Sequence, residues 1–139
     1  MTLNETLSMR VDVLEPEHVE MSMPIGPDVL QVFGYVHGGA TLALIESAAS
    51  VGSHGHASDD EINFGVGVDV RHRRSAREGR LHATADLERI EPSRGVGRKL
   101  FWKVRAFDDE GNTVSDGLFV TKIVPRSYVE APSGAGQES

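Results

Sequence analysis

Residues 38–53, GGATLALIESAASVGS, indicate the fold class of this 139-residue chain. Small or apolar residues occupy nearly every position, and the stretch is too long for an ordinary strand. A helix that is apolar all round is expected to be buried, and its many Gly, Ala and Ser residues allow close packing against a sheet. We therefore predict a buried helix over residues 38–53, with Gly52 and Gly55 marking its C-terminal end.

Alternating apolar and polar residues predict strands on both sides of this helix. Two short runs precede it and are separated by Glu15-Pro16-Glu17, which predicts a hairpin with one buried face. Four runs follow, and each break between them contains a glycine. The apolar positions are Met9, Val11 and Val13; Val19, Met21 and Met23; and then residues 64–70, 81–87, 100–106 and 118–124.

The order strand, strand, helix and four strands predicts an α+β fold, with one curved antiparallel sheet wrapped around one long central helix. We expect one domain over residues 1–125. Residues 126–139 are rich in Gly, Ser and Pro and are expected to lack fixed structure. One sheet and one helix leave strand edges uncovered, which predicts self-association to a dimer or a dimer of dimers.

The composition excludes several classes of protein. The chain has no cysteine, which excludes disulfides, thiolate metal sites and a cysteine nucleophile. It has no apolar run of the roughly 18–20 residues that cross a bilayer and no signal-peptide pattern, so we expect no membrane association and a cytoplasmic location. The net charge of −7 argues against a nucleic-acid partner. His54 and His56 lack convincing metal-ligand spacing, so no metal and no cofactor are predicted.

A basic cluster nevertheless lies between residues 71 and 80, where five arginines accompany one acid, Glu78. On an acidic protein such a cluster suggests a small polyanionic ligand rather than a polymer. A solvated strand end and turn explain it equally well, and the residues alone leave both readings open. The arginines are Arg71, Arg73, Arg74, Arg77 and Arg80.

Glu46 is the unusual residue of the predicted helix, because a lone carboxylate among apolar neighbours is costly unless it is paired or used. Reaching solvent or a structural partner is the simpler explanation. The segment before the helix, QVFGYVHGGA (residues 31–40), places glycines at its start, where free N–H groups bind anions and stabilise an oxyanion. Ser50 shares a helix face with Glu46. Taken alone, His37 fits a structural histidine and Ser50 a packing contact.

With these residues in view, the sequence resembles a known family. HGGATLALIES (residues 37–47) is similar to the signature of hotdog-fold acyl-CoA thioesterases, in the branch whose catalytic acid is Glu. That branch includes aryl-CoA thioesterases acting on 4-hydroxybenzoyl-CoA and 1,4-dihydroxy-2-naphthoyl-CoA. RHRRSAREGRLHA and FDDEGNTVSDGLFVTKIV resemble the family's strand and turn after the helix and its last hairpin, so that the resemblance spans residues 8–124.

The resemblance implies roles for five residues in the hydrolysis of an acyl-CoA thioester. Glu46 matches the catalytic carboxylate, which acts as nucleophile or as general base on water. Gly38 matches the residue whose backbone N–H polarises the thioester carbonyl, and Gln31 and His37 match polar residues that orient the substrate. Ser50 matches a hydroxyl that places the attacking water or holds the acyl group. In the family these groups come from two subunits.

The resemblance also gives the arginine cluster a candidate role, which is to bind the phosphates of coenzyme A, itself part of the substrate. Arg binds phosphate through a planar, bidentate fork. Arg74 and Arg77, around a turn that contains Ser75, are the principal candidates, and His72 is another. Which arginine reaches which phosphate stays open.

The sequence departs from the family in two places. Few residues precede Met9, where many relatives carry a helix that closes the acyl pocket, so we expect either a more open pocket or one that other segments complete. Relatives of the aryl-CoA branch also tend to have Asn near Asp69 and Arg71. The acyl group is therefore open between aryl and medium-chain fatty acyl, and a non-catalytic acyl-CoA binding or sensing protein is the alternative from another class. A hydratase is disfavoured, because we find no matching His and acid pair.

Overall fold

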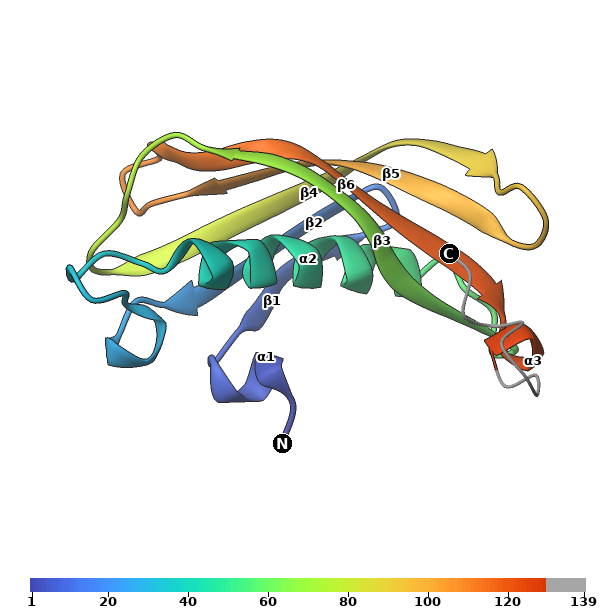
Figure 1. The fold of residues 1–139 in the computed structure, drawn as a ribbon, viewed down its shortest axis with the longest axis horizontal. Coiled ribbons are helices and arrows are strands. Elements are labelled where there is room, and N and C mark those ends of the chain that lie inside the picture. The colour runs from blue at the N-terminus through green and yellow to red at the C-terminus, as the bar shows by residue number, and fades with distance from the viewer. Residues whose placement is uncertain (130–139) are drawn as a thin grey trace.

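The computed structural model describes residues 1–129, in which a curved antiparallel sheet wraps around one side of a long helix (Figure 1). The six strands lie in the order β1-β2-β4-β5-β6-β3. This arrangement confirms the predicted α+β fold. The elements in chain order are α1 (Leu3–Thr6), β1 (Arg10–Glu15), β2 (His18–Pro24), the 3-10 turn η1 (Pro27–Val29), α2 (Gly38–His54), β3 (Glu61–His72), β4 (Arg80–Pro92), β5 (Arg98–Phe107), β6 (Thr113–Pro125) and α3 (Arg126–Val129).

The strands β2, β4 and β5 follow the predicted alternation, but other strands depart from it. In β2 the side chains of Val19, Met21 and Met23 point into the core and are at most 2% exposed. The hairpin partner β1 was predicted to have a buried face too, but Val11 is 46% exposed. The reason is position: β1 is an edge strand that pairs only with β2. In β6 the prediction of Leu118 and Val120 as inward residues is wrong, because Phe119 is the residue that lies opposite the buried Trp102.

The opposite edge of the sheet is formed by β3, which pairs with β6 on one side only. Its register shifts between Gly65 and Gly67, and Val68 is 55% exposed. In Figure 1, β3 (green) lies at the edge of the sheet and crosses the view of α2 near the C-terminal end of the helix. A long, open edge strand beside the helix is the kind of surface that pairs with another chain.

The helix α2 agrees with the prediction to within one residue, but its burial does not. One face packs on the sheet, while the opposite face is open in the single chain, because the sheet curls around one side only. The expectation of a helix buried on all sides is therefore wrong for one subunit. The buried face consists of Thr41, Leu44, Ile45, Ala48, Ala49, Gly52 and Ser53.

Gly52 has a different role from the predicted one. It lies inside the helix rather than at its end, and it packs against the fully buried ring of Trp102. A Cβ at Gly52 would lie 2.6 Å from the Trp102 ring atom Cη2. The indole N–H donates to the Ser53 hydroxyl at 2.8 Å, and that hydroxyl is 2.5 Å from the Thr121 hydroxyl. Gly55 is the residue that ends the helix.

An ion pair fixes the connection between α2 and β3. Arg98 contacts the Glu61 carboxylate at 2.8 Å and also donates to the backbone carbonyl of His56 at 2.7 Å. These bonds from Arg98 and from the Ser58 N–H lower the pKa of Glu61 to about 2. The loop after the helix is thereby held against β5.

Short helices at the two ends correct two expectations. The chain before Met9 forms the helix α1, of one turn, where no helix was expected. Residues 126–129 of the expected unstructured tail form α3, whose first N–H donates to the Asp60 carbonyl. The rest of that tail lies outside the described residues. Among residues 1–129, no helix is long and apolar enough to cross a membrane.

The contact between Gly52 and Trp102 predicts the effect of one added methyl group. Gly52→Ala forces the helix away from a rigid buried ring, which should lower the free energy of unfolding by about 1–3 kcal/mol, although alanine favours a helix by ~1 kcal/mol. Urea denaturation followed by circular dichroism measures it. Gly55→Ala, at an exposed position with a φ of −65°, is the matched control. A Gly52→Ala protein as stable as the parent would contradict this packing.

Candidate functional site

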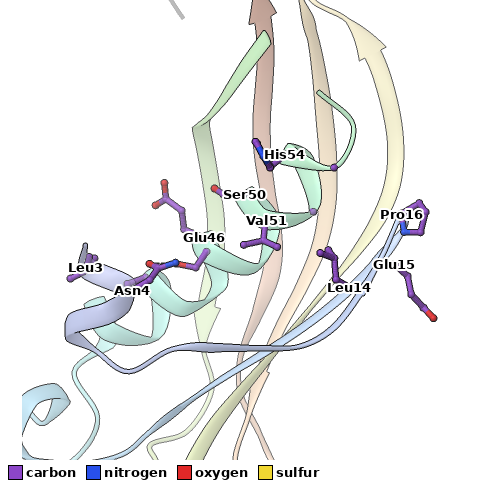
Figure 2. Close-up of a pocket in the computed structure, with 13 residues that line it drawn as sticks. Leu3, Asn4, Leu14, Glu15, Pro16, Glu46, Ser50, Val51 and His54 are labelled. Atoms are coloured by element: carbon purple, nitrogen blue, oxygen red, sulfur yellow. The ribbon is translucent and has the colours of Figure 1, made fainter. Parts of the chain in front are cut away.

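The open face of α2 forms one wall of a cavity of about 790 Å³ (Figure 2). The other walls are the helix α1 and the end of the hairpin β1–β2. Most of the lining is apolar, with a few polar groups, which is typical of a small-molecule site. The lining residues are Leu3, Asn4, Leu14, Glu15, Pro16, Ala43, Glu46, Ser47, Ser50, Val51, Gly52, His54 and Gly55.

Glu46 extends from α2 on the side of the edge strand β3. A Cβ at Gly65 would lie 2.8 Å from the Glu46 carboxylate oxygen Oε2, so the carboxylate lies against bare backbone. Among residues 1–129, no hydrogen bond or ion pair reaches this carboxylate. Ser50, one turn further along, projects on the same side (Figure 2). Of the predicted site residues, these two share the cavity.

The N-terminal end of α2 holds a second group of predicted residues. His37 caps the helix: its ring Nδ1 accepts the Gly39 N–H at 2.8 Å. Within residues 1–129, the Gly38 N–H has no hydrogen-bond partner and is free to bind an anion. The Gln31 side-chain oxygen accepts from the Phe33 N–H at 2.6 Å, which leaves its amide N–H groups as donors.

His72, predicted to bind coenzyme A, lies beside this second group at the start of α2. A Cβ at Gly38 would lie 3.0 Å from the His72 ring atom Nε2. The other ring nitrogen, Nδ1, is 2.6 Å from the hydroxyl of the fully buried Ser115. Ser115 therefore orients the imidazole against the helix start.

The loop of residues 73–79 carries three of the predicted CoA-binding residues, Arg74, Ser75 and Arg77, to the same end of the helix. The Val36 N–H donates to the Ala76 carbonyl at 2.9 Å, which ties this loop to the segment before α2. Both arginines and Ser75 are exposed.

The neighbouring arginines differ in how their guanidinium groups are engaged. Arg73 pairs with Asp116 at 3.0 Å, and Arg80 donates to the Ser22 hydroxyl at 3.0 Å. Arg77 lies 5.2 Å from the centroid of the Tyr35 ring. Within residues 1–129, the guanidinium N–H groups of Arg74 and Arg77 make no hydrogen bonds, so they can bind an anionic ligand.

A second basic cluster was missed in the sequence. Lys99 of β5 lies opposite Lys122 of β6, and Arg94 of the β4–β5 turn lines the same cavity of about 760 Å³, together with Tyr128 of α3. The two lysines are far apart in sequence, and only the strand register brings them together. This cluster, Arg94, Lys99 and Lys122, lies at the end of the sheet near α3.

The site also contains three residues that the sequence did not single out. Asn4 and Ser47 line the cavity and bond to each other, and Gly65 underlies Glu46. The signal for Gly65 was present, since a glycine inside a strand often marks a close approach of another group. Asn4 lies in a helix too short to produce a periodic pattern.

The distance between the two groups of residues limits the chemistry of one chain. Gly38 and Glu46 are separated by eight residues of one helix, a rise of about 12 Å. A single carbonyl cannot accept a hydrogen bond from the Gly38 N–H and be attacked at Glu46 over that separation. Within one chain the two groups therefore cannot act on the same carbonyl.

Comparison with known proteins gives consistent matches over most of the chain. A family model described as the thioesterase superfamily matches residues 33–115. A 1,4-dihydroxy-2-naphthoyl-CoA hydrolase of Listeria monocytogenes is 32% identical over 78% of this chain and 85% of its own length. The Escherichia coli protein of that name is 29% identical over 85% of this chain and 83% of its own length.

Solved structures agree with these matches. A variant of the protein SAV0944 from Staphylococcus aureus, in which a glutamate is replaced by alanine, superposes with a TM-score of 0.81 at 32% identity. The superposition covers 89% of this chain and 99% of that chain. A second variant, of the thioesterase enzyme SAV0944 with a glutamine replaced by alanine, gives a TM-score of 0.81 at 31% identity, over 88% of this chain and 98% of that one.

Proposed function

The chain belongs to the thioesterase superfamily and is a thioester hydrolase with the hotdog fold, and we propose that it hydrolyses acyl-coenzyme A, aryl-CoA in particular. We further propose Glu46 as the catalytic carboxylate and the Gly38 N–H as the oxyanion donor. The aryl preference is supported by the two relatives named 1,4-dihydroxy-2-naphthoyl-CoA hydrolase.

The observation that carries the proposal is the unpaired Glu46 carboxylate beside an apolar cavity. The carboxylate is exposed in the single chain and has no partner in residues 1–129, so it is available to a ligand in the cavity. A further support is the spacing in the Staphylococcus aureus protein. The glutamate and the glutamine replaced in its two variants are separated by as many positions as Glu46 and Gln31.

The reaction proceeds by one of two routes. Glu46 attacks the thioester carbonyl carbon directly, or it removes a proton from a water that attacks it. In both routes the carbonyl oxygen becomes an oxyanion that the Gly38 N–H stabilises. The C–S bond then breaks, and coenzyme A leaves as a thiolate that takes a proton. On the direct route, water hydrolyses the resulting mixed anhydride and regenerates Glu46.

Two chains are needed to complete this site. Because Gly38 and Glu46 are about 12 Å apart along one helix, the Glu46 of one subunit must act with the Gly38 of another. The open edge of β3 runs beside Glu46, since Gly65 of that strand contacts the carboxylate. Antiparallel pairing of two β3 edges around a two-fold axis brings each Glu46 towards the helix start of its partner.

Coenzyme A carries phosphates, and we propose that Arg74 and Arg77 bind them. Both have free N–H groups near the Gly38 end of the helix, where the thioester carbonyl lies in this proposal. The second basic cluster of Arg94, Lys99 and Lys122 is the competing candidate. We also propose that Ser75 and His72 help to bind the acyl-CoA. In this arrangement His72 lies closer to the thioester carbonyl than to the phosphates of coenzyme A.

A protein that binds acyl-CoA without hydrolysing it has the same fold. The unpaired Glu46 carboxylate favours hydrolysis, because a binding protein has no need of an isolated carboxylate next to the reacting carbon. A preference for medium-chain fatty acyl-CoA is the alternative substrate class, since the apolar lining accepts an alkyl chain as well.

Replacing the carboxylate tests the catalytic assignment. Glu46→Gln should lower the turnover of aryl-CoA thioesters by roughly 100- to 10,000-fold, because an amide is neither a base nor a nucleophile. The melting temperature should not fall, since the side chain is exposed and unpaired. Release of free thiol measures the rate. Near-parental turnover in the variant would remove Glu46 from the mechanism.

The phosphate assignment is tested with two double variants. Arg74→Ala with Arg77→Ala should raise the KM for an aryl-CoA thioester by about 10-fold, because the phosphates lose charge-assisted hydrogen bonds. Arg94→Ala with Lys99→Ala is the matched control and should leave KM unchanged. The same acyl group on N-acetylcysteamine, which lacks the phosphates, should be hydrolysed equally by all three proteins. A KM effect confined to the Arg94 and Lys99 variant would move the phosphates to the second cluster.

A further inference from the structure

The helix α1 is joined to the open face of α2 by a side-chain hydrogen bond. Its Asn4 side-chain oxygen Oδ1 accepts a hydrogen bond from the Ser47 hydroxyl at 3.0 Å. The Thr2 hydroxyl caps the helix, and Leu7 and Met9, which follow it, pack against the core. The helix therefore forms one wall of the cavity.

The side-chain amide of Asn4 places hydrogen-bond donors in a part of the cavity wall that is otherwise apolar. Figure 2 shows its amide beside Glu46, with Leu3 next to it and Val51 further along the cavity. Because the oxygen of the amide is engaged by Ser47, the nitrogen is the group left to bind a ligand. Its two N–H groups have no partner in residues 1–129.

We propose that Asn4 is a specificity-determining residue that donates a hydrogen bond to an oxygen substituent of the acyl group. The substrate class is hydroxyaryl thioesters, whose ring lies in the cavity between α1 and α2. The proposal rests on the part of the proposed function that places the acyl-CoA thioester beside Glu46. In this proposal the acyl group binds against the cavity wall formed by α1. The residue that selects between acyl groups, Asn4, is not one of the proposed catalytic residues.

The discrimination comes from what an unsubstituted acyl group does to the amide. A benzoyl or alkyl group covers the Asn4 N–H groups and excludes water from them without offering an acceptor. Leaving these N–H groups unpaired weakens the binding of such an acyl group. An oxygen substituent on the ring accepts the hydrogen bond in place of the displaced water. Because Ser47 is adjacent to Glu46, the oxygen that Asn4 recognises lies close to the reacting carbonyl, and the apolar walls at Leu14 and Val51 contact the rest of the ring.

The test compares two substrates in three proteins. The substrates are benzoyl-CoA and the hydroxybenzoyl-CoA isomer that the parent hydrolyses fastest. Asn4→Leu keeps the size of the side chain and removes the donor, and it should lower the ratio of the two kcat/KM values by about 3- to 10-fold without lowering the value for benzoyl-CoA. Glu5→Leu places the same side chain at the next position of α1 and should leave the ratio unchanged.

Binding separates this inference from the proposed function. Ketone analogues, in which a methylene group stands between the carbonyl and the sulfur, cannot be hydrolysed, and calorimetry gives their Kd. The hydroxyaryl ketone should bind the parent about 3- to 10-fold tighter than the unsubstituted one, with that preference lost in Asn4→Leu. If this holds while no acyl-CoA is hydrolysed, the inference stands and the hydrolase proposal fails. An unchanged ratio, or an equal loss for both ligands, would overturn the role of Asn4.

Discussion

The contact between Trp102 and the small residues late in α2 determines where the helix lies on the sheet. The ring of Trp102 is fully buried and packs against Gly52, where a side chain would collide with it. The indole N–H donates a hydrogen bond to the Ser53 hydroxyl. The Ser53 hydroxyl is in turn within 2.5 Å of Thr121. Because these contacts hold one face of the helix tightly, the opposite face stays open and presents Glu46 to the cavity.

In the proposed mechanism, the helix itself explains why one chain would hold half of a site. It carries the anion-binding N–H of Gly38 and the carboxylate of Glu46 about 12 Å apart. A rigid helix cannot shorten that distance, so completing the site needs a second helix. The open edge of β3, whose Gly65 contacts Glu46, is where a second chain can approach. The proposed pairing of two chains and the proposed catalytic roles therefore rest on the same geometry.

Local patterns in the sequence predict the elements well, because alternation and helix composition are local properties. Pairings between distant residues are another matter. Gly52 was interpreted as a helix end because its neighbour Trp102 is far away in the chain. The cluster with Lys122 depends on strand register, and Asn4 lies on a single turn of helix. The family resemblance supplied the roles of Glu46 and Gly38, whereas the residues alone left them open.

Mixing two inactive variants tests the shared site most directly. Glu46→Gln removes the carboxylate, and Gly38→Pro removes the N–H at a position where proline suits a helix start and follows an extended His37. Each variant alone should be inactive. When they are unfolded and refolded together, half of the dimers are mixed and each holds one complete site, so the account predicts about a quarter of the parental activity. A mixture as inactive as its two components would contradict a site built from two chains.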